Sequence, residues 1–102
     1  MTDPYLSHED ATIESFRQDP AYAAEYLNAV LADGSQDELM LALRRVASAF
    51  GLKDVAGQAG LNPKTIYRTL SPSGNPELKN FQAILAAMGM RLAVTPLAKY
   101  GA

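Results

Sequence analysis

The chain has 102 residues, of which 48% are hydrophobic, and it carries a formal net charge of −2. This length suits a single domain, and the hydrophobic share indicates a folded globule rather than a disordered chain. The absence of cysteine excludes a disulfide framework and a cysteine-based metal site. No apolar run is long enough to span a bilayer, and residues 1–10 lack the features of a signal peptide, so a soluble cytoplasmic protein is expected.

The charged residues are distributed unevenly along the chain. Residues 1–40 contain nine acidic residues and one basic residue, a net charge of −8, whereas residues 41–79 carry a net charge of +4. A basic segment in an acidic protein indicates a local surface for an anionic partner such as DNA. Two solvated faces of unlike composition would give the same pattern. A charge of only +4 predicts modest DNA affinity per subunit and a strong dependence on salt.

The first sixteen residues predict little regular structure. Residues 1–9 are expected to form a loose arm, and residues 10–16 a short helix with Ile13 and Phe16 on one side. His8 is the only histidine of the chain. Because it stands alone in a polar arm, it is expected to be an ordinary surface residue rather than a ligand or a catalyst.

The next helix is predicted from residue 19 to residue 33. Asp19 supplies an acidic N-cap, Pro20 follows at the first helical position, and Gly34 can close the C-terminus. The helix has a wide apolar face, with the phenol groups of Tyr22 and Tyr26 at its margin. This face either packs on its own domain or, in an acidic helix outside the minimal DNA-binding unit, meets a partner protein.

A core helix is predicted from residue 35 to residue 50. Ser35 and Glu38 have the spacing of a capping box, and Gly51 ends the helix. Its apolar stripe consists of Leu39, Leu43, Val46, Ala47 and Phe50. Arg44 and Arg45 lie off this stripe, where they could reach phosphates, but nothing in the sequence assigns them to a site.

Residues 52–70 predict two short helices around a tight turn, the pattern of a helix-turn-helix. A small residue in the first helix allows close approach, and a glycine four positions later can adopt positive φ. Asn62 is a good N-cap for the second helix, and Pro63 follows at its first position. The positions expected to pack within the motif are Val55, Ala56, Gly60, Ile66 and Leu70.

The second helix is expected to be the recognition helix in the DNA major groove. Base readout is assigned mainly to Arg68, which can make a bidentate contact to guanine, and to Asn62. Lys53, Lys64 and Ser71 are expected to bind phosphates. Tyr67 is expected to stack on a base or to contact a thymine methyl. The predicted DNA-binding residues are Lys53, Asn62, Lys64, Thr65, Tyr67, Arg68 and Ser71. An ordinary helical hairpin in a core is the alternative, because helix–glycine–helix is a common arrangement.

A loop and a last helix are predicted after the helix-turn-helix. Residues 71–76, SPSGNP, cannot continue a helix. Asn75 and Pro76 repeat the N-cap-then-proline start, so the last helix is expected to begin there and to end near Gly89. Its apolar face consists of Leu78, Phe81, Ile84, Leu85 and Met88.

Residues 90–95 change to a period of two, which predicts one β-strand ended by Pro96. Its apolar positions are Met90, Leu92 and Val94. Because a lone strand is not stable by itself, pairing with the same strand of a second copy would give a two-fold dimer. Such a dimer would place two recognition helices on half-sites roughly 34 Å apart. A disordered tail is the alternative.

Together these residues resemble the addiction-module antidote proteins, antitoxins of the HigA-like class with a lambda-repressor-like DNA-binding domain. The resemblance runs over about four-fifths of the chain. Its segments are DPAYAAEYLNAVLADG, ELMLALRRVASAFGL and VAGQAGLNPKTIYRTLSPSGNPELKNFQAILAAMGMRLAV. The stretch YRTLSPSGNPELKNF, between the recognition helix and the last helix, is especially specific.

The resemblance implies a small bacterial protein, encoded beside a RelE/HigB-type toxin, that silences this toxin and represses its own operon. By position it places Asn62, Lys64, Tyr67 and Arg68 where the motif contacts DNA. Lys53 is a departure, because a Ser or Thr cap usually opens the first helix of the motif there. The neighbouring aspartate at 54 is expected to take part of that role.

The expected fold class is all-α: a lambda-repressor-like helix-turn-helix bundle with an N-terminal helical extension and one C-terminal β-strand paired across a dimer. Its expected parts are residues 1–34, an arm and an acidic helix; residues 35–89, the DNA-binding domain; and residues 90–102, a strand and a tail. All are expected to form one structural unit. The expected partners are operator DNA, a RelE/HigB-like toxin and a second copy, with no membrane, cofactor or metal.

Two other functions stay open. One is a repressor without a toxin, which only the identity of the adjacent gene would separate from an antitoxin. The other is a protein-interaction module that does not use DNA and works through the acidic first 40 residues. An enzyme is not expected, because the chain has one histidine, no cysteine, no glycine-rich phosphate loop after a strand and no paired carboxylates in an evident pocket.

Overall fold

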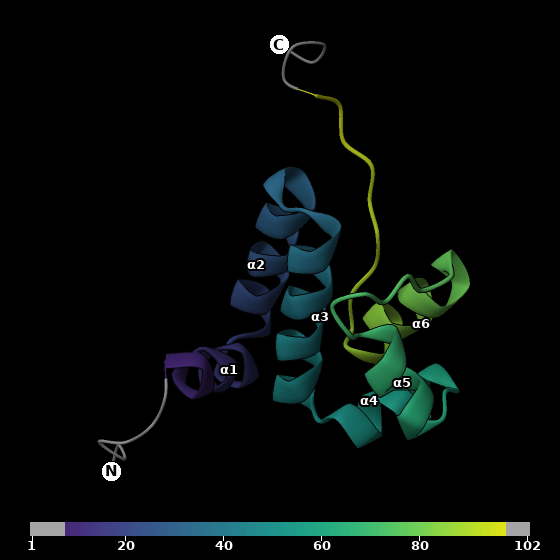
Figure 1. Cartoon of the computed structure of the whole chain (residues 1–102). Helices are drawn as coiled ribbons and strands as arrows, with labels where there is room; N and C mark the ends of the chain where they lie inside the picture. Colours follow the sequence, from purple (N-terminus) through teal and green to yellow (C-terminus); the bar gives the residue numbers. More distant parts are fainter. Residues whose placement is uncertain (1–7, 98–102) are drawn as a thin grey trace.

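The computed structural model describes residues 8–97, with side chains from residue 11 onward. Within this range the fold is all-α, as predicted, and compact. In Figure 1, α2 and α3 stand side by side as an antiparallel pair, α1 crosses one end of the pair, and the last three helices gather on the other side of α3. The helices are α1 (His8–Gln18), α2 (Pro20–Asp33), α3 (Gln36–Phe50), α4 (Leu52–Ala59), α5 (Pro63–Thr69) and α6 (Leu78–Ala87). The predicted arm before residue 8 and the tail after residue 97 lie outside the described residues.

Two helix starts have the predicted caps. The Asp19 side chain accepts a hydrogen bond from the Tyr22 backbone N–H at 3.2 Å, which satisfies one free donor at the start of α2. At the start of α3, the Ser35 hydroxyl accepts from the Glu38 N–H at 3.2 Å. The Glu38 carboxylate accepts from the Ser35 N–H at 3.0 Å in return. The capping box is therefore complete.

The first helix is longer than the predicted segment 10–16 and belongs to the core. Phe16 is 0% exposed, and its ring centroid lies 4.7 Å from that of Tyr26 and 5.5 Å from that of Tyr22. The Arg17 Nε also donates to the Ala49 carbonyl at 3.1 Å, which ties α1 to the end of α3. The sequence did not predict this anchoring, because it depends on aromatic residues that come together only when α1 folds back on α2.

The last helix begins later than predicted. The first helical hydrogen bond runs from the Phe81 N–H to the Glu77 carbonyl at 2.9 Å, so Glu77 and not Asn75 is the N-cap residue. Glu77 has φ −61° and ψ 148°, an extended conformation. Because Asn75 and Pro76 also lie outside the helix, the N-cap-then-proline pattern at this position was a wrong prediction of the helix start.

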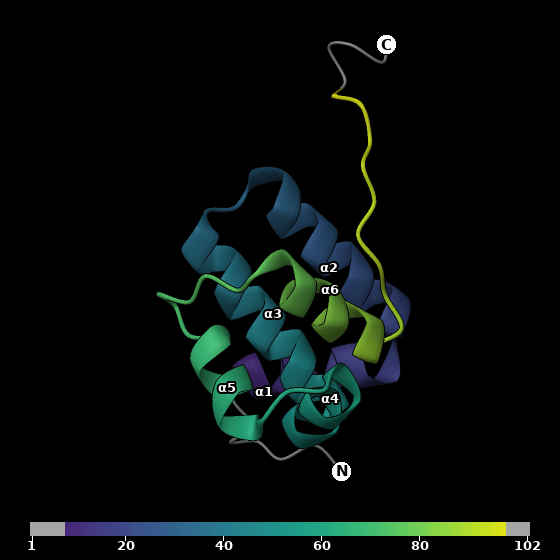
Figure 2. The same cartoon turned by 90° about the vertical axis from the view of Figure 1, so that its right-hand side faces the viewer.

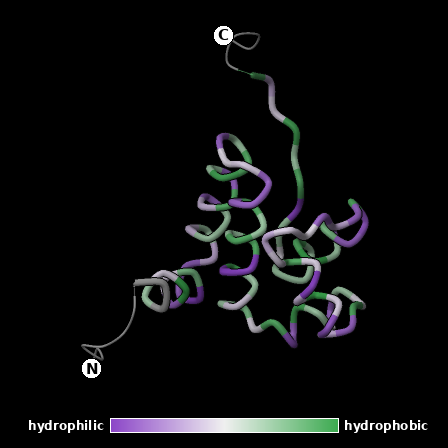
Figure 3. The backbone as a smooth tube through the Cα atoms, viewed as in Figure 1, coloured by the Kyte–Doolittle hydropathy of each residue, from purple (hydrophilic) through white to green (hydrophobic). Residues whose placement is uncertain are grey.

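The predicted strand over residues 90–95 is not formed in the described chain. After α6, residues 91–97 continue in an extended path that leaves the body of the protein (Figure 1). A strand needs a neighbour for its backbone groups, and no described segment offers one. Met90 and Leu92 instead pack against the core of their own chain, whereas Val94 is 99% exposed. In Figure 3 this segment is largely green, so an apolar stretch projects from the described body.

The capping box predicts a pH-dependent stability. The hydrogen bond from the Ser35 backbone, and to a smaller extent the Ser35 side chain, lowers the pKa of the Glu38 carboxyl below its ordinary value of 4.5. A pKa lowered on folding adds stability above the ordinary value, and this stability is lost as the pH falls through the folded value. Glu38→Gln is therefore expected to reduce the unfolding free energy at pH 7 and to have a smaller effect at acidic pH, in urea titrations.

Asp37→Asn is the matched control for this substitution. Asp37 lies in the same first turn of α3 and is exposed, but it makes no recorded hydrogen bond to the N-cap residue. An equal pH dependence for the two variants would contradict the assignment to the capping box.

A second prediction concerns the loop after α5. The Gly74 N–H donates to the Ser71 carbonyl at 2.8 Å, and a Cβ at Gly74 would collide with the Thr69 and Ser71 carbonyl oxygens. Gly74→Ala is expected to lower the unfolding free energy by about 1–3 kcal/mol, the range of an overpacked site. Thermal or urea denaturation would measure this loss.

Gly57→Ala is the matched control, because it adds the same methyl group at a position with free space. Gly57 lies inside α4, and a Cβ there would meet nothing within 4 Å. Gly57→Ala is expected to leave stability unchanged or to raise it by up to about 1 kcal/mol, because alanine is the better helix former. If Gly74→Ala is as stable as the wild type, the loop backbone can move to accommodate the Cβ, and the predicted loss of stability is contradicted.

Candidate nucleic-acid interface

The helices α4 and α5 meet at a left-handed turn. Gly60 has φ 73° and ψ 27°, and the Leu61 N–H donates back to the Ala56 carbonyl at 2.8 Å. Only glycine adopts this backbone region at little cost, so Gly60 fits the turn. Of the other expected packing positions, Val55, Ala56, Ile66 and Leu70 are all buried. Ala56 is 0% exposed, and its small side chain fits a place where neighbouring helices come close.

The start of α4 has no side-chain cap. Gly51 stands at the N-cap position with φ 95°, and no side chain accepts a hydrogen bond there. The N-cap residue is therefore Gly51 and not position 53, where a Ser or Thr cap was expected, and Lys53 is the second residue of α4. Asp54 lies in the first turn, where a negative charge interacts favourably with the helix dipole.

Both ends of α5 are closed by side chains from the predicted site. The Asn62 Oδ1 accepts from the Lys64 N–H at 2.8 Å, and Pro63 occupies the first position. At the other end, the Ser71 hydroxyl donates to the Arg68 carbonyl at 2.8 Å. Since a hydroxyl has one hydrogen to donate, Ser71 is engaged in capping and would have to rotate to reach a phosphate. The NH₂ group of Asn62 has no recorded partner among the described residues.

The remaining predicted side chains form an exposed surface on α5. Lys64, Tyr67 and Arg68 are exposed at positions i, i+3 and i+4, which are neighbours on a helix. Tyr67 is 47% exposed, a large value for an aromatic ring. Thr65 is half-buried, so it is less outward than predicted. Lys53 is exposed at the start of α4, the other helix of the motif.

Arg44 on α3 joins this surface, although the sequence prediction omitted it. Its guanidinium carbon lies 5.5 Å from the centroid of the Tyr67 ring, within the range of a cation–π interaction. The only signal in the sequence was that Arg44 lies off the apolar stripe of its helix. That signal could not identify Tyr67 as its neighbour, because the two residues meet through the packing of α3 beside the helix-turn-helix.

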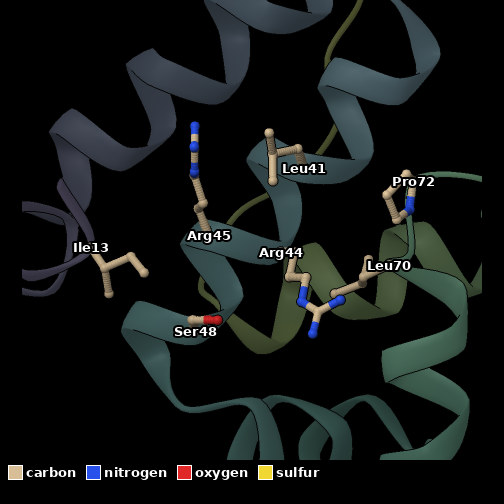
Figure 4. Close-up of a pocket in the computed structure, with 7 residues that line it drawn as sticks. All are labelled: Ile13, Leu41, Arg44, Arg45, Ser48, Leu70 and Pro72. Atoms are coloured by element: carbon tan, nitrogen blue, oxygen red, sulfur yellow. The ribbon is translucent and has the colours of Figure 1, made fainter. Parts of the chain in front are cut away.

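An open groove of about 400 Å³ lies beside this contact. Figure 4 shows α3 at its floor, α1 on one side and the end of α5 on the other. Arg44 points toward Leu70, whereas Arg45 points away from it. The Arg45 Nη1 donates to the Tyr26 hydroxyl at 3.4 Å, so this side chain is directed toward α2.

The acidic part of the chain presents a different surface on α2. Tyr22, Glu25, Ala29 and Asp33 follow one another at helical spacing, and all four are exposed. Tyr22 is 45% exposed even though one side of its ring contacts Phe16. No described residue lies within 4.0 Å of the Glu25 or Asp33 carboxylate as an ion-pair partner.

The described residues bear on two further expectations. They contain no group of three or more histidine, cysteine or acidic side chains placed to hold a metal ion. None of the described helices combines the length and the apolar character that a membrane crossing requires.

Comparisons with known proteins identify the family. The family model described as "Probable addiction module antidote protein" matches residues 9–96, which is most of the chain. An uncharacterized protein of Haemophilus influenzae is 28% identical over 69 residues, which cover 68% of this chain and 71% of that protein. The comparison with solved structures gave no match. The chain therefore belongs to the family of probable addiction module antidote proteins.

Proposed function

We propose that this protein is the DNA-binding antitoxin of a type II toxin–antitoxin module. In this proposal it neutralises a RelE/HigB-like toxin, represses its own operon as a homodimer, and has no enzymatic activity. Membership of an antidote family implies a toxin partner. The observation that carries the DNA-binding part is the exposed row of Lys64, Tyr67 and Arg68 on the helix that follows the left-handed turn.

The dimensions and chemistry of α5 suit the major groove. An α-helix with its side chains is about 10–12 Å wide, and the major groove is about 12 Å wide. Arg68 can contact the O6 and N7 atoms of a guanine with two parallel hydrogen bonds. The Asn62 NH₂ group is the donor that the capping hydrogen bond leaves free for a base. Lys53 and Lys64 supply phosphate contacts, while Thr65 and Ser71 have secondary roles because both are half-buried.

The extended segment after α6 supports dimer formation. Val94 is 99% exposed, and the backbone of residues 91–97 makes no recorded hydrogen bond within the described chain. Pairing with the same segment of a second copy would satisfy these groups and cover Val94. Met90 and Leu92 then contribute from the core side of the interface, since both already pack on their own chain.

The outer surface of α2 is the proposed toxin contact. Toxins that act on RNA need basic groups, and Glu25 and Asp33 offer carboxylates without a partner in the described chain. Tyr22 adds a large, rigid contact area, which is typical of residues that dominate protein interfaces. The surface lies on the opposite side of α3 from the helix-turn-helix (Figure 1), so toxin and DNA could be bound together.

A repressor without a toxin is the closest alternative, and a protein-interaction module that does not use DNA is the next. Co-expression with the product of the adjacent gene, followed by a gel shift of the protein's own promoter, separates the three. An antitoxin captures the neighbouring product and shifts the promoter, a simple repressor only shifts the promoter, and an interaction module only captures the partner.

Arg68→Ala is expected to weaken binding to the cognate operator by about 1–3 kcal/mol, because it removes a bidentate base contact. Gel-shift titration at fixed salt would measure the loss. Lys79→Ala is the matched control, since Lys79 is an exposed cation on α6, a helix that lies apart from α5 (Figure 2) and belongs to neither proposed surface. An equal effect of the two variants would remove Arg68 from base readout.

Glu25→Lys is expected to weaken capture of the toxin about tenfold or more, because it places a like charge against a basic surface. Co-purification and titration calorimetry would measure this, and DNA binding should persist. Glu77→Lys, an exposed acid at the start of α6, is the control. Point variants are needed here, because deleting residues 1–34 would remove the buried Phe16 and Leu27 from the core. Undiminished capture would place the toxin contact elsewhere.

A further inference from the structure

Arg44 has an arrangement that its place in a core helix does not explain. It is half-buried, yet no described residue accepts a hydrogen bond from it or brings a carboxylate within 4.0 Å of it. Its one recorded interaction is with the ring of Tyr67, at 5.5 Å. The side chain also lines an open groove, so its N–H donors, which have no anionic partner in the described chain, can be reached from outside. These donors are available to a partner that binds from outside the chain.

The chemistry of the side chain narrows the class of that partner. A guanidinium has five N–H donors in one plane and binds phosphate with two parallel hydrogen bonds. A cation–π contact with an aromatic ring depends on the charge of the guanidinium and leaves its N–H donors free. Contact with Tyr67 thus orients Arg44 without consuming any of the groups that would bind an anion.

The position of Arg44 indicates that this anion belongs to the DNA backbone. Because α5 is about as wide as the major groove, side chains directly beside α5 face the phosphates that border the groove. Arg44 lies beside α5 through its contact with Tyr67. It also opens onto the groove of about 400 Å³ between α1 and the end of α5, where Ser48 supplies a second polar group (Figure 4).

We propose that Arg44 binds a backbone phosphate of the operator and, through its contact with Tyr67, positions the recognition helix. The inference rests on the proposed DNA binding and adds to it a contact from α3, outside the helix-turn-helix. A phosphate contact carries no sequence information, so Arg44 sets affinity and orientation while base readout stays with α5.

The test compares Arg44→Gln, Arg44→Lys and wild type at several salt concentrations, by fluorescence anisotropy with a labelled fragment of the protein's own promoter. Arg44→Gln is expected to bind roughly tenfold more weakly, the loss of one charge-assisted hydrogen-bonded contact. Its slope of log K against log salt should be smaller by about 0.9, the value for one phosphate. Arg44→Lys should keep the slope but lose affinity, because a lysine cannot bind phosphate with two parallel hydrogen bonds.

Two controls separate this role from a structural one. Lys79→Gln removes one positive charge from α6, a helix that lies apart from α5, and should leave both affinity and slope at the wild-type values. Tyr67→Leu removes the ring, so a double-mutant cycle with Arg44→Gln should show that the two effects are not additive. Thermal melts followed by circular dichroism establish that each variant is folded.

The outcomes are distinct for this inference and for the proposed function. If folded Arg44→Gln binds with wild-type affinity and slope while Arg68→Ala loses binding, the Arg44 inference is overturned and DNA recognition by α5 stands. If Arg44→Gln loses capture of the toxin and keeps DNA binding, the groove holds an acidic protein segment, which also overturns it. If the wild-type protein fails to bind its promoter, the proposed DNA binding fails, and the inference fails with it.

Discussion

The packing of α3 against its neighbours is the interaction on which the rest of the structure depends. This helix contacts α1, α2 and α4, and six of its residues are buried. Three of these are alanines, Ala42, Ala47 and Ala49, whose small side chains let helices approach from more than one direction. Its two ends are stopped sharply, by the capping box at Ser35 and by Gly51 with φ 95°. The direction of the chain into α4 is thereby set.

Because α3 is shared, the acidic helices and the helix-turn-helix form one body. Phe16 of α1 and Leu27 of α2 lie in the same cluster of buried residues as Ile66 of α5 and Ile84 of α6. The N-terminal helices are therefore part of the core and not an appendage to it. In the proposed function, a toxin bound at α2 and DNA bound at α5 would lie on opposite sides of α3, and the shared core would connect them.

The hydrogen bonds at the ends of α5 separate the roles of its polar residues. Asn62 and Ser71 use polar side-chain atoms to hydrogen-bond the backbone of α5 itself. A helix of only 7 residues needs such bonds, because few of its backbone groups are paired within the helix. Lys64 and Arg68 make no such bond with their side chains in the described chain. The polar side chains of α5 thus fall into those that cap the helix and those that are available to a ligand.

Much of the fold follows from patterns that are local in the sequence. The caps at Asp19, Ser35 and Asn62 and the left-handed glycine at 60 each depend on residues within four positions of one another. Local backbone geometry and periodicity suffice for such features, and the all-α class and the helix-turn-helix spacing follow from them. At Asn75 and Pro76 the local pattern does not mark the helix start, because Glu77 is extended and α6 begins only after it.

The sequence by itself determined where most helices begin, which residues line each apolar face and where the two helices around the left-handed turn lie. Only the tertiary structure decided that Phe16 joins the core, that Met90 and Leu92 cover their own chain, and that Arg44 lies over Tyr67. The physical reason is the same in each case. These contacts join residues of different elements, and their distances are set by how whole helices pack against one another, which no local pattern encodes.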